Sequence, residues 1–79
     1  MLKVGTQVKV VRPIDNWPDC YIEPGETGTL TEIDKYYWWV KLDADHPELE
    51  EWDNKVQIWD WSDEEHPEWH PSGYLEPIK

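Results

Sequence analysis

The sequence is marked first by residues that are absent or scarce. It has no phenylalanine and a single cysteine, Cys20, among its 79 residues. One cysteine excludes an internal disulfide framework and a thiolate cluster, and it fits a reducing compartment. No apolar run is long enough to span a membrane, and the start of the chain lacks the pattern of a secretory signal peptide. We therefore expect a cytoplasmic protein without a membrane segment.

Basic residues are also scarce. Seven Lys and Arg stand against 18 Asp and Glu, which gives a formal net charge of -11 at pH 7. Residues 41–79 hold twelve of the acids and three of the bases, and Lys55 is the one Lys or Arg between Asp43 and Glu68. Proteins that bind nucleic-acid backbones or anionic membranes rely on Lys and Arg to reach phosphates. We therefore expect no direct contact with nucleic acid and none with a membrane.

The missing phenylalanines are replaced by seven Trp and four Tyr. A chain of this length predicts a single domain over residues 1–79, near the size at which one core just offsets the entropy of ordering the chain. Trp and Tyr rings bury a large area each. The composition therefore predicts that most of these rings pack in the interior.

Short segments rich in β-branched and aromatic residues predict an all-β fold. Turn residues separate them, and sustained helical periodicity is absent except for one or two turns over residues 47–54. Adjacent residues of a strand face opposite sides of a sheet, so one of Trp38 and Trp39 should be core and the other surface. The five predicted strands are Val8–Pro13, Thr27–Ile33, Tyr36–Leu42, Lys55–Trp61 and Gly73–Ile78.

The stretch Ile14–Glu26 interrupts this strand pattern. It carries Pro18 and a Pro24-Gly25 turn pair, and both features favour irregular backbone. We therefore expect a long irregular loop, held to the body of the protein by Trp17, Tyr21 and Ile22.

Four sequence stretches, "VGTQVKVVRP", "PGETGTLTEID", "WVKL" and "SGYLEPI", together resemble the SH3-like small barrels. That group includes KOW-type ribosomal and transcription modules and an accessory subunit of photosystem I. The resemblance implies a small five-stranded SH3-like barrel with long acidic loops and at most a short helical turn. The basic loops of the nucleic-acid-binding members are replaced here by "DADHPELEEWDN" and "SDEEHPEWHP", so the resemblance does not extend to that function.

Two histidines raise the question of a metal site. His66 and His70 have the His-x3-His spacing that aligns two imidazoles on one face of a helix, and Asp43, Asp45 and His46 could add ligands. A proline directly follows both histidines, however, and breaks the helix that this spacing requires. The Asp-x-Asp pair also lacks the glycine of a calcium-binding loop. We therefore expect no metal and no cofactor.

Catalytic patterns are weak throughout the chain. Ser62 and Ser72 have no glycine elbow, and Cys20 has no basic neighbour that would favour the thiolate. Carboxylates beside tryptophans are typical of sugar-cleaving sites, but 79 residues leave little room for such a cleft. We therefore expect a protein that is not an enzyme.

The acids concentrate in two related stretches, "DADHPELEEW" and "DEEHPEW". Alternate residues of an extended chain lie roughly 6.5–7 Å apart, near the spacing of phosphates along a DNA strand. A solvated rim that keeps the protein soluble is the alternative interpretation. The candidate partner-binding residues are two acidic ridges, each with a tryptophan: Asp43, Asp45, Glu48, Glu50, Glu51, Asp53 and Trp52 in the first, and Asp60, Asp63, Glu64, Glu65, Glu68 and Trp69 in the second.

In size, charge and layout, the chain resembles the small acidic inhibitors that phages encode against CRISPR effectors and restriction enzymes. The resemblance implies a DNA mimic that blocks the channel of a basic DNA- or RNA-binding protein. One alternative is an SH3-like accessory subunit that docks on an enzyme or electron-transfer partner through Tyr36–Trp39 and the long first loop. Another is a carbohydrate-binding module that uses exposed Trp.

Overall fold

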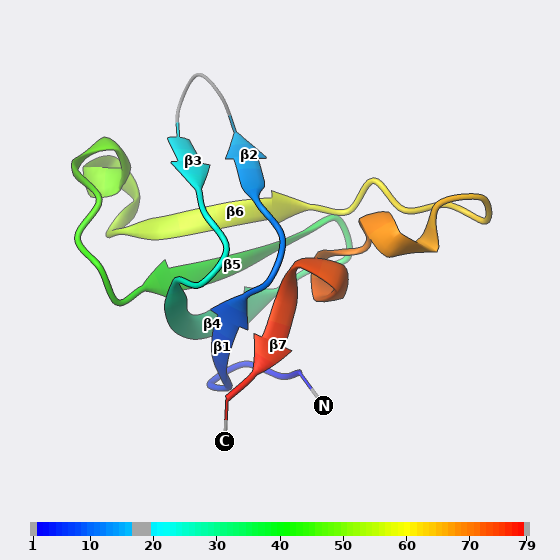
Figure 1. The fold of residues 1–79 in the computed structure, drawn as a ribbon, viewed down its shortest axis with the longest axis horizontal. Helices are drawn as coiled ribbons and strands as arrows, with labels where there is room; N and C mark the ends of the chain where they lie inside the picture. The colour runs from blue at the N-terminus through cyan, green and yellow to red at the C-terminus, as the bar shows by residue number, and fades with distance from the viewer. Residues whose placement is uncertain (1, 17–19, 79) are drawn as a thin grey trace.

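The computed structural model describes residues 2–16 and 20–78 and has an all-β architecture (Figure 1). An antiparallel sheet of five strands has the order β6-β5-β4-β1-β7, and β2 and β3 form a separate hairpin. The predicted small all-β fold is confirmed, with seven strands in two sheets where five strands were expected. The strands are β1 (Gln7–Val10), β2 (Ile14–Asn16), β3 (Cys20–Ile22), β4 (Thr27–Ile33), β5 (Tyr37–Leu42), β6 (Lys55–Trp59) and β7 (Leu75–Pro77).

The strand boundaries follow from the pairing. β4 matches its predicted range in full, whereas the other four strands of the sheet are shorter than predicted. Because Tyr37 begins β5 and pairs with Trp59, β6 ends there, two residues before Trp61. In the same way, β1 ends at Val10, which pairs with Leu75 at the start of β7.

The prediction of an irregular first loop is wrong for Ile14–Asn16 and Cys20–Ile22, which form β2 and β3. Ile14 and Ile22 pair across the β2–β3 hairpin, and both side chains are buried. Apolar contact at the base of the hairpin therefore outweighs the irregularity that the prolines predict. Tyr21 is exposed and does not hold the loop down, contrary to expectation, while Trp17 lies outside the described residues.

The helical content consists of short 3-10 segments. They are η1 (Pro47–Trp52), η2 (Pro67–Trp69) and η3 (Pro71–Tyr74), and each begins with proline, whose fixed φ suits a first helical position. The predicted turn over residues 47–54 is confirmed as η1, and the other two segments were not predicted. Among the described residues, no helix has the length and apolar character needed to cross a membrane.

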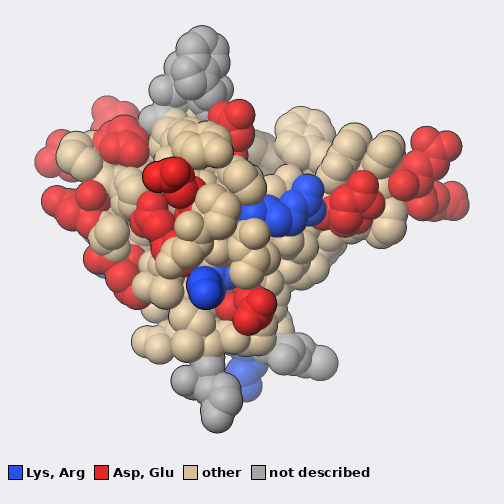
Figure 2. Space-filling model, in the orientation of Figure 1, with Lys and Arg blue, Asp and Glu red and all other residues tan. Residues whose placement is uncertain are grey.

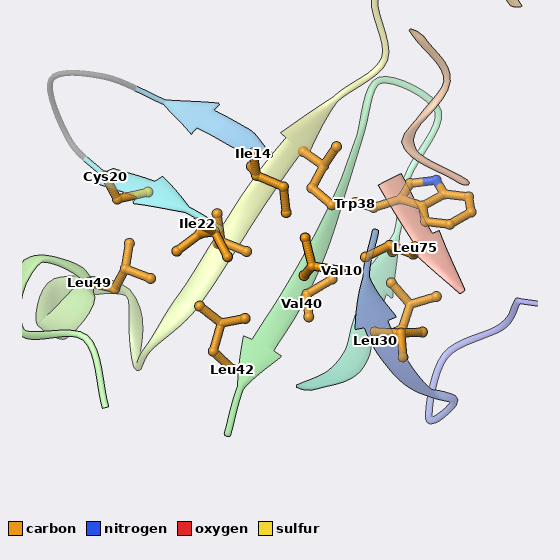
Figure 3. Close-up of a cluster of buried hydrophobic side chains, with 13 residues drawn as sticks. Val10, Ile14, Cys20, Ile22, Leu30, Trp38, Val40, Leu42, Leu49 and Leu75 are labelled. Carbon is orange, nitrogen blue, oxygen red and sulfur yellow. The ribbon is translucent and has the colours of Figure 1, made fainter. Parts of the chain in front are cut away.

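The core is aliphatic, contrary to the prediction that most rings are buried. Trp38 is the one aromatic residue of the buried cluster among the described residues, and half-buried Trp39 faces the other side of β5, as predicted for adjacent residues. Alternation along the strands directs Val and Ile inward and most Trp outward. Figure 3 shows the cluster, formed by Val8, Val10, Ile14, Cys20, Ile22, Leu30, Trp38, Val40, Leu42, Leu49, Val56, Ile58 and Leu75.

The two edges of the five-stranded sheet are β6 and β7. The side-chain amide of Asn16 donates a hydrogen bond of 2.7 Å to the carbonyl of Gln57 in β6. This contact sets the β2–β3 hairpin beside β6. The hairpin therefore lies along the β6 edge of the sheet, with Ile14 and Ile22 in the core.

Candidate partner-binding surfaces

The first acidic loop (Asp43–Asn54) connects β5 to β6 and contains η1. Leu49 is buried in the core and anchors the loop. The side-chain amide of Asn54 donates to the carbonyls of Leu42 (2.9 Å) and Ala44 (2.7 Å), and its oxygen accepts from the amide of His46 at 2.8 Å. These bonds close the loop at its base and hold its carboxylates in a defined arrangement.

The return of this loop into β6 uses unusual backbone. Asp53 and Asn54 have φ values of 58° and 62°, in the left-handed region that Asp and Asn adopt more readily than most residues. At the other end of the loop, the hydroxyl of Thr27 donates to Oδ2 of Asp43 at 2.6 Å. The sequence therefore places turn-forming residues where the chain must reverse.

His46 ties the first acidic loop to the turn before β4. Its Nε2 lies 2.7 Å from Glu26 Oε1 and its Nδ1 lies 3.3 Å from Glu48 Oε2, while its side chain is 16% exposed. Burial opposes a charge on this ring, but the hydrogen bonds and negative charges of Glu26 and Glu48 together raise the pKa of His46 above 6.5. The pKa of Glu48 is lowered by a hydrogen bond to its own backbone amide and by the contact with His46.

We expect His46→Gln to lower the free energy of unfolding by about 0.5–1 kcal/mol near pH 6, the size of a partly exposed ion pair. Because the pKa of His46 is raised in the folded state, its contribution is fully present below 6.5 and is lost as the pH rises through the folded pKa. Urea unfolding of both proteins near pH 6 and pH 8.5 measures the difference. An equal difference at the two pH values would show that the charge of His46 contributes nothing. The matched control is His66→Gln, which removes a more exposed ring with a single carboxylate partner.

The second acidic loop (Asp60–His70) extends from the end of β6 to η3. Its tip is closed by Asp63, whose Oδ1 accepts the backbone amides of Glu65 (2.9 Å) and His66 (2.7 Å). The far side of the loop is held by Arg12, whose Nη1 donates to the carbonyl of Glu68 at 2.6 Å. These hydrogen bonds therefore fix the backbone that carries the acids at the tip.

Asp60 differs from the other acids of the second loop. It is half-buried, and its Oδ1 accepts from the hydroxyl and the backbone amide of Ser62. These hydrogen bonds are the main reason that the pKa of Asp60 is lowered, with a smaller contribution from the charge of His70. Asp60 therefore stabilises the start of the loop, although the sequence placed it on the exposed ridge.

The histidines of the second loop have separate contacts. The ring of His66 stacks on Trp69 at a centroid distance of 3.9 Å, whereas the rings of His70 and Trp38 form a T-shaped contact at 5.3 Å. The chain runs through η2 and η3 here rather than a continuous helix. Within the described part of the chain, no group of three His, Cys, Asp or Glu side chains is arranged to hold a metal ion.

The two acidic loops lie at opposite ends of the molecule. Acidic side chains gather at both ends of the longest axis in Figure 2, over η1 at one end and over the segment between β6 and η2 at the other. This separation follows from the topology, because one loop precedes β6 and the other follows it. The two predicted ridges therefore form two clusters on the face shown, not one continuous surface.

Most acids in these loops face solvent without a basic neighbour. Lys41 Nζ lies 3.4 Å from Asp53 Oδ2. In residues 2–16 and 20–78, Asp53 is the one acid of the two loops that forms an ion pair with a Lys or Arg side chain. Glu48, Asp60 and Glu68 contact histidines, and most of the remaining charge of both loops is left available to an outside cation.

Trp52 and Trp69, which the sequence placed among the candidate partner-binding residues, are both exposed in part, and Trp69 carries the stacked His66. Trp38, offered by the sequence as a docking residue, lies in the core at 8% exposure.

A groove of about 380 Å³ lies between the β2–β3 hairpin and the β6 edge of the sheet. Trp39, Trp59 and Trp61 line it together with Trp52 from the first acidic loop. The spacing of two residues between Trp59 and Trp61 predicts that their rings lie on the same face of a strand. The groove itself was missed, because its opposite wall is the hairpin that the sequence predicted as irregular.

Comparisons with protein-family models, with curated proteins and with solved structures find no match for this chain.

Proposed function

We propose that this protein is a non-enzymatic acidic inhibitor that binds a basic DNA- or RNA-binding protein and occupies its nucleic-acid channel. The observation that carries the proposal is the exposure of the loop acids, of which Asp53 alone pairs with a Lys or Arg among the described residues. Uncompensated charge of this kind opposes folding through self-repulsion. A partner lined with Lys and Arg offsets that repulsion and gains charge-assisted hydrogen bonds.

The arrangement of the loops supports a partner of particular shape. The molecule is 36 Å along the axis that has acids at both ends, close to the roughly 34–36 Å of one turn of B-DNA. A channel that grips DNA at two points one turn apart presents two basic patches at this spacing. Because both loops are held by internal hydrogen bonds, little ordering is needed on binding, which favours affinity.

The class of partner that we propose is the DNA-binding channel of a host defence complex, such as a CRISPR effector or a restriction enzyme. Size, charge and layout support this choice. Competition with duplex DNA for the same Lys and Arg is the mechanism, and attraction between opposite charges would speed association.

The experiment uses immobilised protein to capture DNA-binding proteins from a lysate at low and high salt. We expect capture at low salt, release by added duplex DNA, and a loss of affinity of at least about 100-fold when Glu50, Glu51, Glu64 and Glu65 are all reversed to Lys. Each loop pair reversed alone should give a smaller loss. Captured proteins are identified by mass spectrometry, and affinities are then measured on the purified partner.

The matched control reverses Glu32 and Glu76, two exposed acids outside both loops. It changes the net charge as much as either loop pair does. Equal losses for the control and a loop pair would show that only net charge matters. Retention of binding by the fourfold variant, or a captured partner that duplex DNA does not displace, would rule out the inhibitor.

A further inference from the structure

The groove between the β2–β3 hairpin and the sheet is a second binding feature, apart from the acidic loops. We propose that it binds an arginine side chain, with the guanidinium stacked on the rings of Trp59 and Trp61. The inference rests on the proposed function in one respect: the basic partner supplies the arginine. The site is otherwise defined by its own geometry.

The aromatic floor of the groove is built by strand pairing. Trp59 pairs with Tyr37 across β5 and β6, and Trp39 pairs with Gln57 one step along the same side. The Tyr37 ring meets Trp59 edge-on at a centroid distance of 5.3 Å and meets Trp39 edge-on at 6.2 Å. Edge-to-face packing of this kind holds both indoles in place.

Trp61 extends this floor beyond the end of β6. It is 68% exposed, and its ring lies 6.4 Å from that of Trp59 at an angle of 36°. Two tilted indoles at this separation offer a concave aromatic surface at the end of the groove. Trp52 and Trp59 also line the groove and are 41% and 43% exposed, and contiguous exposed apolar surface of this kind is typical of a contact surface.

Charge selects a cation as the occupant. The chain carries a net charge of -11, and Asp15 lines the groove beside Asn16. Indole faces attract cations through their quadrupole, and guanidinium also stacks on them as a planar group. A neutral sugar carries no charge, so the negative charge of the protein would not add to its binding energy.

One basic residue, Lys55, also lines the groove. It begins β6 and stands four residues before Trp59, which is about 13 Å along an extended strand. Its charge therefore lies away from the Trp59 and Trp61 end, and that end is where we place the guanidinium.

The test uses three capped peptides of Gly and Ser that differ at one central residue: arginine, lysine or citrulline. Binding is followed by NMR through the indole N–H signals. We expect the arginine peptide to shift the signals of Trp59 and Trp61, to bind about fivefold more tightly than the lysine peptide, and to bind more tightly than the citrulline peptide. In Trp61→Ala, the ratio of the affinity for the arginine peptide to that for the lysine peptide should fall to about one.

Trp69→Ala is the matched control, because Trp69 is a partly exposed indole outside the groove. It should leave the preference for arginine unchanged. Trp59→Ala should also remove the preference for arginine, but it could fail to fold. Trp61 is so exposed that its removal should not disturb folding, and the test can therefore rely on Trp61→Ala alone. Circular dichroism checks each variant.

Two results would overturn the inference. One is equal binding of the arginine and lysine peptides by the wild-type protein. The other is binding of cello- or chito-oligosaccharides that Trp61→Ala abolishes, which would assign the groove to carbohydrate. The fourfold Lys variant of the acidic loops separates this inference from the proposed function: it should keep the preference for arginine over lysine although its overall affinity for cations falls.

Discussion

Replacing Trp38 by alanine should lower the free energy of unfolding by about 3–5 kcal/mol, the usual cost of removing a buried Trp side chain. Trp38 is 8% exposed and lies in the core that joins β5 to its neighbours. Its ring also packs against that of His70, at the end of the second acidic loop. The same change should therefore loosen that loop. Urea unfolding measures the stability, and hydrogen exchange of residues 60–70 measures the loop.

Trp39→Ala is the matched control for this experiment, because it removes the same side chain from the adjacent position. Trp39 is half-buried on the opposite side of β5, and its ring forms a T-shaped contact with that of Tyr37. We expect a loss of about 1–2 kcal/mol, consistent with one aromatic pair and partial burial. Equal losses at the two positions would contradict the assignment of Trp38 to the core.

Gly28→Val should lower the free energy of unfolding by about 3 kcal/mol, at the upper end of the usual range for overpacking. A Cβ at position 28 would lie 2.5 Å from the carbonyl oxygen of Lys41 and 2.9 Å from a methyl carbon of Val40. The first of these is backbone of the paired strand and cannot move aside without breaking the β4–β5 ladder. Thermal and urea unfolding would measure the change.

Thr29→Val is the control for the glycine substitution. It introduces the same side chain one position along β4, where Thr29 is only half-buried and faces away from the core. We expect a change within about 0.5 kcal/mol, as for most substitutions near a surface. A loss as large as that of Gly28→Val would show that β4 tolerates no change of residue, and the close approach at Gly28 would then explain nothing.

The sheet strands could be predicted from sequence because β-branched residues alternate within short segments bounded by turn residues. Val56 and Ile58 point inward, and Gln57 and Trp59 point outward, as the alternation in Lys55–Trp61 predicts. The exact ends could not be predicted, since they depend on which residue of the neighbouring strand is available to pair. The hairpin of β2 and β3 was missed for a related reason: three-residue strands give too short a pattern to stand out from a loop with prolines.

Residue type also misled the prediction of the core. Trp is a large apolar residue, yet alternation places Trp39 and Trp59 on the outer side of the sheet. The aliphatic residues already fill the inner side. The packing of all the strands together decides which side of a strand faces the interior. The number of aromatic residues in the sequence does not reveal that side.

The acidic loops could be located from sequence but not positioned. Asp63 and Asn54 are residues that favour turns, and both close their loops as such residues do. The contact from Arg12 to Glu68, in contrast, joins residues 56 positions apart. Contacts of that range follow from the fold, and so does the placement of the two loops at opposite ends of β6.

The negative charge of the acidic loops also affects how the edges of the five-stranded sheet behave toward other copies of the protein. An edge strand has backbone donors and acceptors that can recruit a strand from another molecule and start aggregation. β7 is short and contains Pro77, which has no amide to donate. β6 is longer, and the carbonyl of Gln57 already accepts from Asn16 of the β2–β3 hairpin. One acidic loop precedes β6 and the other follows it, so two copies that approach edge to edge bring like charges together. Lowering the pH to the pI of about 4.4 removes most of the net charge and should therefore favour aggregation through β6, whatever the protein binds.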